Sequence, residues 1–235
     1  MKSLKLIFFG LILIGLNAPA FGQKLLPGAY TFSKKKIAYI TLNDGTEVEG
    51  NIKDIDRKKG LIKSIKIKDV QGEKQEFKAS DISSMYLAPS GWDNFGKMYD
   101  FMYDPTKWDN DNYKQGLLKE GYAYFEQAEV EMGRKTRVLL MQLLNPSFSS
   151  KIKVYMDPWA SETTSVGVGG FKLAGGDKKS YYVKDGERMA FLLKKKDYKD
   201  NFNALFGDCK KMLPLKKGAK WSQFDQHVFD FTSCN

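Results

Sequence analysis

Apolar and polar residues alternate in short runs between residues 31 and 87, which is the pattern of β-strands with one buried and one solvated face. Turn-forming residues separate the runs, most clearly at Asp44-Gly45, because a tight hairpin needs a positive φ that glycine adopts at little cost. The strands predicted in this region are residues 37–42, 46–55, 61–68, 74–79 and 82–87. Short strands at this spacing suit a compact five-stranded barrel.

Residues 44–50 have the pattern DGT-x-V-x-G, and Gly50 falls inside the second predicted strand, where a glycine allows a sharp bend. Together with a last strand that begins at Asp81-Ile82, this pattern resembles a small SH3-like or Sm-like β-barrel. The resemblance implies the fold of residues 23–90 and no particular activity, because such barrels serve many unrelated functions.

Aromatic residues gather between residues 90 and 113, where they are mixed with Asp and Asn. Part of this stretch has helical spacing, so residues 91–121 are predicted to be a connector that packs between neighbouring units. The alternative is a glycan-binding platform, in which flat rings meet apolar sugar faces. The candidate ligand-binding residues are Trp92, Tyr99, Trp108 and Tyr113.

Longer and more apolar runs predict a second group of strands at residues 122–132, 136–144 and 151–156, and a further hairpin within residues 181–193. The glycine-rich stretch 161–176 lacks the glycine offsets of a phosphate-binding loop. We therefore expect a long mobile loop between strands there.

Two amphipathic helices are predicted at the end of the chain. Asp197 caps the first and Gly207 stops it, whereas Ser222 caps the second with Asp225 at the capping-box position. The fold class predicted for the whole chain is mainly β (α+β overall). A small N-terminal β-barrel is followed by the connector and by a mixed antiparallel sheet domain with C-terminal helices, residues 122–235.

The N-terminal residues 1–22 have the features of a cleaved secretory signal. Lys2 and Lys5 precede an apolar run that is too short to span a bilayer, and small residues follow it, with Ala20 and Gly22 at the −3 and −1 positions. No second apolar run follows, so the mature chain is predicted to have no transmembrane span. We expect export to the periplasm, to the outer membrane or to the medium.

The two cysteines, Cys209 and Cys234, agree with export, because a pair of cysteines in an exported chain is most simply one disulfide. Two free thiols or half of a metal site is the alternative, but no His or Cys partners lie near them in the sequence.

The chain carries a formal charge of +10, and removal of Lys2 and Lys5 leaves +8. Sm-like barrels often bind RNA, and a set of lysines on the predicted strands would suit a phosphate-facing surface. These are Lys58, Lys59, Lys63, Lys66 and Lys68. Export argues against a nucleic-acid partner, and lysines on the wet face of a strand are ordinary.

Catalytic and metal-binding motifs are absent from the sequence, so it favours a non-enzymatic role and predicts no cofactor. His227, the only histidine, borders an apolar stripe and is interpreted as structural. Glu126, Glu129 and Glu131 are interpreted as a solvated strand edge rather than a glycosidase pair.

A possible calcium loop begins at Asp109. It would use Asp111 and Glu120 as further ligands, but Lys114 replaces the glycine that makes its sharp turn. The stretch is therefore interpreted as a solvated acidic loop, and no metal site is predicted.

The whole layout resembles exported proteins of Bacteroidota envelopes that have no characterised activity. The signal ending Ala20-Phe21-Gly22-Gln23, the stretch 182–186, Asp208-Cys209 and the Phe-rich last helix carry this resemblance. It implies a non-catalytic envelope or surface protein. We expect a protein-binding or assembly component whose partner is another envelope protein, bound through an exposed sheet edge or the aromatic connector. The alternative is a glycan or cell-wall binding module, or a weak glycosidase, that uses the aromatic connector.

Overall fold

The computed structural model describes residues 24–90, 112–160, 165–168, 171–175 and 178–234, with the backbone alone described at 165–168 and 171–175. The first strands are β1 (Ile37–Leu42), β2 (Glu47–Lys58), β3 (Leu61–Asp69), β4 (Lys74–Lys78) and β5 (Ile82–Leu87). The later strands are β6 (Ala123–Met132), β7 (Lys135–Leu143), β8 (Ile152–Met156), β9 (Ser165–Val168), β10 (Phe171–Gly175), β11 (Ser180–Asp185) and β12 (Phe191–Lys194). The α-helices of the described residues are α2 (Gln115–Lys119), α3 (Tyr198–Phe206) and α4 (Phe224–Thr232).

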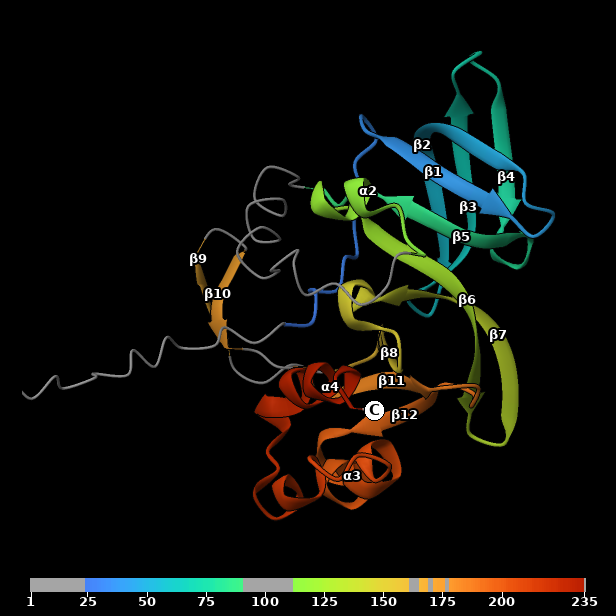
Figure 1. The fold of residues 1–235 in the computed structure, drawn as a ribbon. Coiled ribbons are helices and arrows are strands. Elements are labelled where there is room, and N and C mark those ends of the chain that lie inside the picture. The colour runs from blue at the N-terminus through green and yellow to red at the C-terminus, as the bar shows by residue number, and fades with distance from the viewer. Residues whose placement is uncertain (1–23, 91–111, 161–164, 169–170, 176–177, 235) are drawn as a thin grey trace, which may run out of the picture.

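Ten of these strands form one antiparallel sheet in the order β12-β11-β8-β7-β6-β5-β1-β2-β3-β4, and β9 pairs with β10 alone. The mainly β fold with C-terminal helices is therefore confirmed. Figure 1 shows the long strands β6 and β7 running from the N-terminal half of the sheet to the C-terminal half. The strands predicted at 37–42 and 82–87 have the predicted bounds, and the others differ by a few residues at their ends.

The first five strands do not form a barrel separate from the rest of the fold. Within the described residues, β4 pairs only with β3, and β5 continues the sheet by pairing with β6 through Met85 and Phe125 among others. The second half of the sheet curls back on itself, because Ala190 just before β12 bridges to Val130 near the end of β6. The amide of Ala190 also donates to the carbonyl of Glu129 at 2.7 Å.

Two hydrophobic cores lie along this one sheet, and β6 and β7 contribute to both. Phe125 and Leu140 belong to the core of the N-terminal half, whereas Tyr124 and Met141 belong to the core of the C-terminal half. Successive side chains of a strand point to opposite faces, so neighbouring residues of one strand reach different cores. The end of β7 nearest the β6–β7 hairpin is solvated, and Val138 there is 57% exposed.

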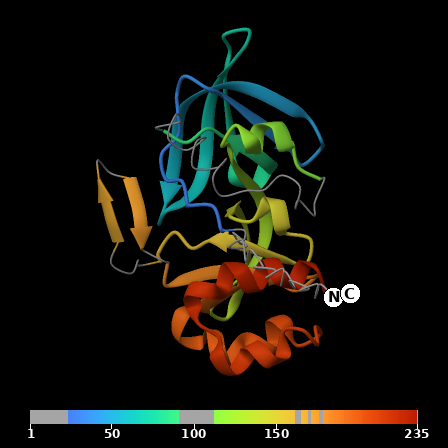
Figure 2. The same ribbon diagram turned by 60° about the vertical axis from the view of Figure 1, so that its left-hand side comes forward.

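Helices α3 and α4 pack together against the C-terminal half of the sheet, as Figure 2 shows. A disulfide between Cys209 and Cys234 joins the ends of the two helices, which confirms the predicted pairing. At the other end of the described chain, Lys24 forms an ion pair with Asp225 of α4 at 2.9 Å.

Two local predictions were wrong. Helix α4 begins after Gln223 rather than Ser222, because Trp221–Gln223 forms a separate turn of 3-10 helix in front of it. The glycine-rich stretch is not simply a loop, since β9 and β10 pair within it. Most of the predicted aromatic connector, residues 91–111, lies outside the described residues.

Candidate functional site

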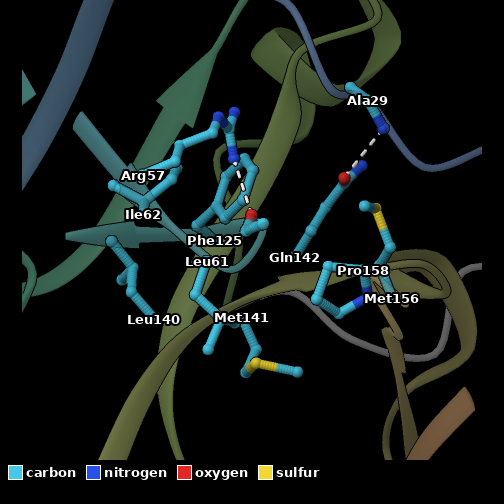
Figure 3. A pocket seen from close by; sticks show the side chains of 11 residues that line it. Ala29, Arg57, Leu61, Ile62, Phe125, Leu140, Met141, Gln142, Met156 and Pro158 are labelled. Carbon is cyan, nitrogen blue, oxygen red and sulfur yellow. Dashed lines mark hydrogen bonds between the residues drawn. The ribbon is translucent and has the colours of Figure 1, made fainter. Parts of the chain in front are cut away.

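A small cavity lies where the segment before β1 crosses the hairpin of β2 and β3 (Figure 3). Its volume of about 20 Å³ is room for one water molecule. The Arg57 guanidinium donates to the carbonyls of Gly60 and Tyr30 at 3.1 and 3.0 Å, and the buried Gln142 amide accepts from the amide of Ala29. Burial lowers the pKa of Arg57 from its usual value. These hydrogen bonds attach the N-terminal segment to the sheet. The residues around the cavity therefore have a structural role, and the cavity is not a ligand site.

A half-buried ion pair connects β6 to β8 across β7. Lys153 Nζ lies 2.8 and 3.0 Å from the two carboxylate oxygens of Glu126, and the Tyr155 hydroxyl donates to Glu126 Oε1 at 2.7 Å. Burial, followed by the adjacent Glu126 carboxylate, raises the pKa of Tyr155. The prediction of a solvated strand edge is therefore wrong for Glu126, whose strand is internal and whose side chain is only 13% exposed. The Glu126 carboxylate, the Lys153 ammonium and the Tyr155 hydroxyl satisfy one another's hydrogen bonds, as in a structural ion pair.

Tyrosine rings cover this pair. The rings of Tyr86 and Tyr113 each lie with their centroids 4.8 Å from that of Tyr124. Burial raises the pKa of Tyr86 to about 12, and its hydroxyl accepts the amide of Lys114 at 2.8 Å. Because each hydroxyl would be costly to ionise here, the tyrosines are neutral and hold position rather than transfer protons.

His227 is buried in the helical layer, as its place on an apolar stripe predicted. Its Nδ1 is 2.5 Å from the hydroxyl of Tyr198, and the rings of Phe202 and Phe206 contact it. Burial lowers the pKa of His227 from its usual value of 6.5, although Asp230 and Asp225 act in the opposite direction. The neutral imidazole is therefore the stable form inside the protein.

The Asp157-Pro158-Trp159 turn after β8 presents the most exposed tryptophan of the described residues. Asp157 is buried and fixes this turn: one carboxylate oxygen accepts the amide of Trp159 at 2.9 Å, and the other accepts the hydroxyl of Ser180 at 2.6 Å. Trp159 is 44% exposed. The hydrogen bonds of the buried Asp157 carboxylate therefore fix the turn that places the Trp159 ring at the surface. Contact of this apolar ring with water is unfavourable in free energy.

An open depression of about 450 Å³ lies beside Trp159, and we call it the Trp159 depression. Several turns and strand ends meet there: the tip of the β2–β3 hairpin, the tip of the β6–β7 hairpin, and the middle of β11 and β12. Its lining residues are Lys59, Glu131, Met132, Gly133, Trp159, Tyr182 and Leu192. Distant parts of the sequence thus build one concave surface.

Lys59 is the one non-glycine residue of the described chain with a positive φ, at 51°. Such a conformation costs free energy for a residue with a Cβ atom, so asparagine or glycine is the usual choice in this hairpin turn. Gly60 beside it packs closely on Pro158: a Cβ atom there would lie 2.9 Å from the proline ring. The strained lysine is therefore held next to the turn that carries Trp159.

The predicted ligand-binding residues are not found together in the described structure. Trp92, Tyr99 and Trp108 lie outside the described residues. Tyr113 is buried in the tyrosine cluster, and the Ser149 hydroxyl donates to its hydroxyl at 3.3 Å, so its ring is not on the surface. Asp109 and Asp111 of the rejected calcium loop also lie outside the described residues.

Sequence reasoning overlooked both the Glu126–Lys153 pair and the Trp159 depression. A charged residue within an apolar strand, as in Ile152-Lys153-Val154, was the available signal for the pair. The Asp157-Pro158 dipeptide was the signal for a turn that could present Trp159. Neither signal identified its spatial partners.

No cluster of three or more His, Cys, Asp or Glu side chains suited to a metal ion occurs among the residues that the structure describes. None of the helices in that part of the chain has the length and apolarity that a bilayer crossing requires. Comparison of the chain with protein-family models, with curated proteins and with solved structures finds no match.

Proposed function

We propose that this is an exported, non-enzymatic binding protein, an assembly component of the cell envelope, whose contact surface is the Trp159 depression. The observation that carries the proposal is a tryptophan held at the surface, 44% exposed, by the buried carboxylate of Asp157. Exposing such a ring costs solvation free energy, and a partner that covers it recovers that free energy.

The chemistry of the Trp159 depression favours a protein partner. Met132 and Leu192 give apolar surface beside the tryptophan, while Lys59 and Glu131 place opposite charges among the lining groups. An aromatic anchor beside apolar side chains, with charged groups around it, is the usual arrangement of a protein-binding hot spot. We expect the partner to insert an apolar side chain beside Trp159.

A glycan is the second candidate, and the described residues support it less. Tyr182 is only 4% exposed, so Trp159 is the one aromatic ring of this surface that a sugar could stack on. The lining holds one carboxylate, Glu131, whereas glycoside cleavage ordinarily uses two. The aromatic connector remains a predicted glycan site.

Export of the protein and the likeness of its first five strands to an SH3-like or Sm-like unit stay predictions. The signal sequence at residues 1–22 supports export, and the Cys209–Cys234 disulfide suits an oxidising compartment. N-terminal sequencing of the mature protein should find Gln23 first. The meander of β1 to β4, with β5 returning to pair with β1, supports the proposed likeness to an SH3-like or Sm-like unit, here opened into a larger sheet.

The test is site-specific photo-crosslinking in envelope extract, with a photoreactive residue in place of Trp159. The control carries the same residue in place of Val138, which is 57% exposed on β7. We expect one protein to crosslink from position 159 and not from 138, and Lys59→Glu to reduce its yield. Equal crosslinking from both positions, or none from 159, would contradict the proposal. Retention on purified cell-wall glycan that Trp159→Ala abolishes would favour the glycan candidate.

A further inference from the structure

Between α3 and α4 the chain carries a strongly basic loop. From Cys209 to Phe224 the sequence contains five lysines and no acidic residue. The lysines are Lys210, Lys211, Lys216, Lys217 and Lys220. None of the five is in an ion pair within the described part of the chain, and four are exposed while Lys216 is half-exposed. We call residues 210–220 the basic loop.

Two leucines project from the middle of the basic loop. Leu213 is 45% exposed and Leu215 is 41% exposed, and Pro214 between them is exposed as well. All three lie in a short 3-10 helix, Leu213–Gly218. Together they form an exposed apolar tip in the middle of the basic loop.

The exposure of these leucines is built into the structure, because the chain is anchored on both sides of them. Met212 is 1% exposed and Trp221 is 7% exposed, and the Trp221 indole donates to the carbonyl of Lys178 at 2.6 Å. The Cys209–Cys234 disulfide fixes the start of the loop to the end of α4. The loop therefore cannot bury its leucines without releasing one of these anchors.

We propose that the basic loop docks on the surface of an anionic lipid bilayer. Lysines around an apolar tip match such a surface in both respects: the ammonium groups meet the phosphate headgroups, and the leucines enter the boundary with the acyl chains. A nucleic acid would satisfy the lysines but leave the leucines in water. The proposal is independent of the Trp159 depression, which uses none of these residues.

The expected binding is reversible and dependent on charge. Each lysine near an anionic surface contributes roughly a fivefold increase in partitioning at low salt, and screening removes this contribution as salt rises. Insertion of the leucines contributes a part that salt does not remove. The two contributions can therefore be measured separately.

The experiment is co-sedimentation of the mature protein with vesicles of phosphatidylcholine alone or mixed equally with phosphatidylglycerol. We expect binding to the mixed vesicles only. At about 1 M salt, where charges are screened beyond roughly 3 Å, the binding should weaken to the small part that the leucines contribute. The variant Lys216→Gln/Lys217→Gln should bind about 25-fold less tightly. Leu213→Ser/Leu215→Ser should bind at least tenfold less tightly.

Matched controls come from elsewhere on the surface. Lys58→Gln/Lys68→Gln removes two exposed lysines of the sheet, and Val70→Ser/Val138→Ser removes two exposed apolar side chains. Both controls should bind as the wild type does, and unfolding curves should show that all variants are folded. Equal loss in the controls, binding to phosphatidylcholine alone, or unchanged binding of the leucine variant would overturn the proposal. Stronger binding to an acidic protein or to a soluble polyanion than to the vesicles would also overturn it.

Discussion

At the scale of single residues, the half-buried pair of Glu126 and Lys153 is a polar contact whose partners depend on each other. Glu126 accepts both the Lys153 ammonium and the Tyr155 hydroxyl. Removing one partner leaves a poorly solvated charge, whereas removing both charges leaves none. The cost of a substitution there should therefore depend on whether its partner is also changed.

We expect Glu126→Leu to lower the free energy of unfolding by roughly 2–4 kcal/mol, because Lys153 and Tyr155 then lose their acceptor. The double variant Glu126→Leu/Lys153→Met should be more stable than the single variant. Urea unfolding of the wild type, both single variants and the double variant measures the coupling. Additive effects in this cycle would show that the pair contributes nothing as a pair.

His227 should make the stability dependent on pH. Its pKa is lowered in the folded protein, so the unfolded chain takes up a proton first as the pH falls below 6.5. Stability should therefore decrease between pH 6.5 and the lowered pKa, and this contribution should level off below it. Asp225 and Asp230 moderate the loss, because they favour the charged imidazole.

The measurement is the free energy of unfolding from pH 7.5 to 5 for the wild type and for His227→Gln, whose side chain retains a polar group near the Tyr198 hydroxyl. The variant should lose less stability across this range. Parallel pH curves for the two proteins would mean that the imidazole does not titrate between the folded and unfolded states. This pH range is chosen because it brackets the ordinary pKa of histidine, about 6.5.

At the scale of elements, Gly50 shows how a correct sequence signal can have a different cause. The sequence predicted a glycine bend in the second strand. In the structure, β2 and β3 approach so closely at Gly50 that a Cβ atom there would lie 2.5 Å from the carbonyl oxygen of Lys68. The neighbour is backbone, so it cannot rotate away.

Gly50→Ala should therefore lower the free energy of unfolding by about 1–3 kcal/mol, since the two strands must separate to admit the methyl group. Gly116→Ala is the matched control, because a Cβ atom at Gly116 in α2 meets nothing within 4 Å. That substitution should be neutral or stabilising by up to about 1 kcal/mol. Thermal unfolding compares the two variants, and an equal effect would reject the steric explanation.

The disulfide holds the two C-terminal helices at one end. Cys209 and Cys234 are separated by 25 residues, and in the chain-entropy model closing such a loop contributes about 3–4 kcal/mol. The variant Cys209→Ser/Cys234→Ser should lose that stability, and a reducing agent should destabilise the wild type but not the variant. Calorimetry with and without the reducing agent tests this prediction. A wild type that is unaffected by reduction would contradict it.

At the scale of the whole molecule, two cores share one sheet. Leu140 and Met141 are neighbours on β7, yet Leu140 packs in the N-terminal core and Met141 in the C-terminal core. Because β6 and β7 line both cores, neither half can lose these two strands without disrupting the other half. The protein should therefore unfold in one cooperative transition.

Leu140→Ala and Met141→Ala should each lower the midpoint of that same transition, at a cost of about 2–5 kcal/mol. The exposed neighbour Val138 provides the control, and Val138→Ala should change the free energy of unfolding by less than about 0.5 kcal/mol. Circular dichroism and tryptophan fluorescence should report coincident curves. Two separate transitions, each shifted by only one of the core variants, would show independent domains.

The sequence by itself determined the local elements. Alternating side chains and glycine turns placed most strands to within a few residues, since a strand with one buried face must alternate. Helix α3, Tyr198–Phe206, followed from its apolar face and from the stop at Gly207, although the Asp197 side chain makes no capping hydrogen bond. The pairing of the two cysteines followed from their number. Each of these features depends on contacts that are local, or on the presence of a single possible partner.

The tertiary structure decided what lies side by side. It joined the predicted barrel and the second group of strands into one sheet through β5 and β6. It also brought Lys59 and Trp159 to one depression, and Glu126 and Lys153 to one ion pair. Backbone hydrogen bonds between strands are the same whatever the sequence, so they do not specify which strands pair. Which strands pair at their edges, and which side chains of distant strands come into contact, depends on the register and curvature of the sheet. Periodicity along the chain contains no such information.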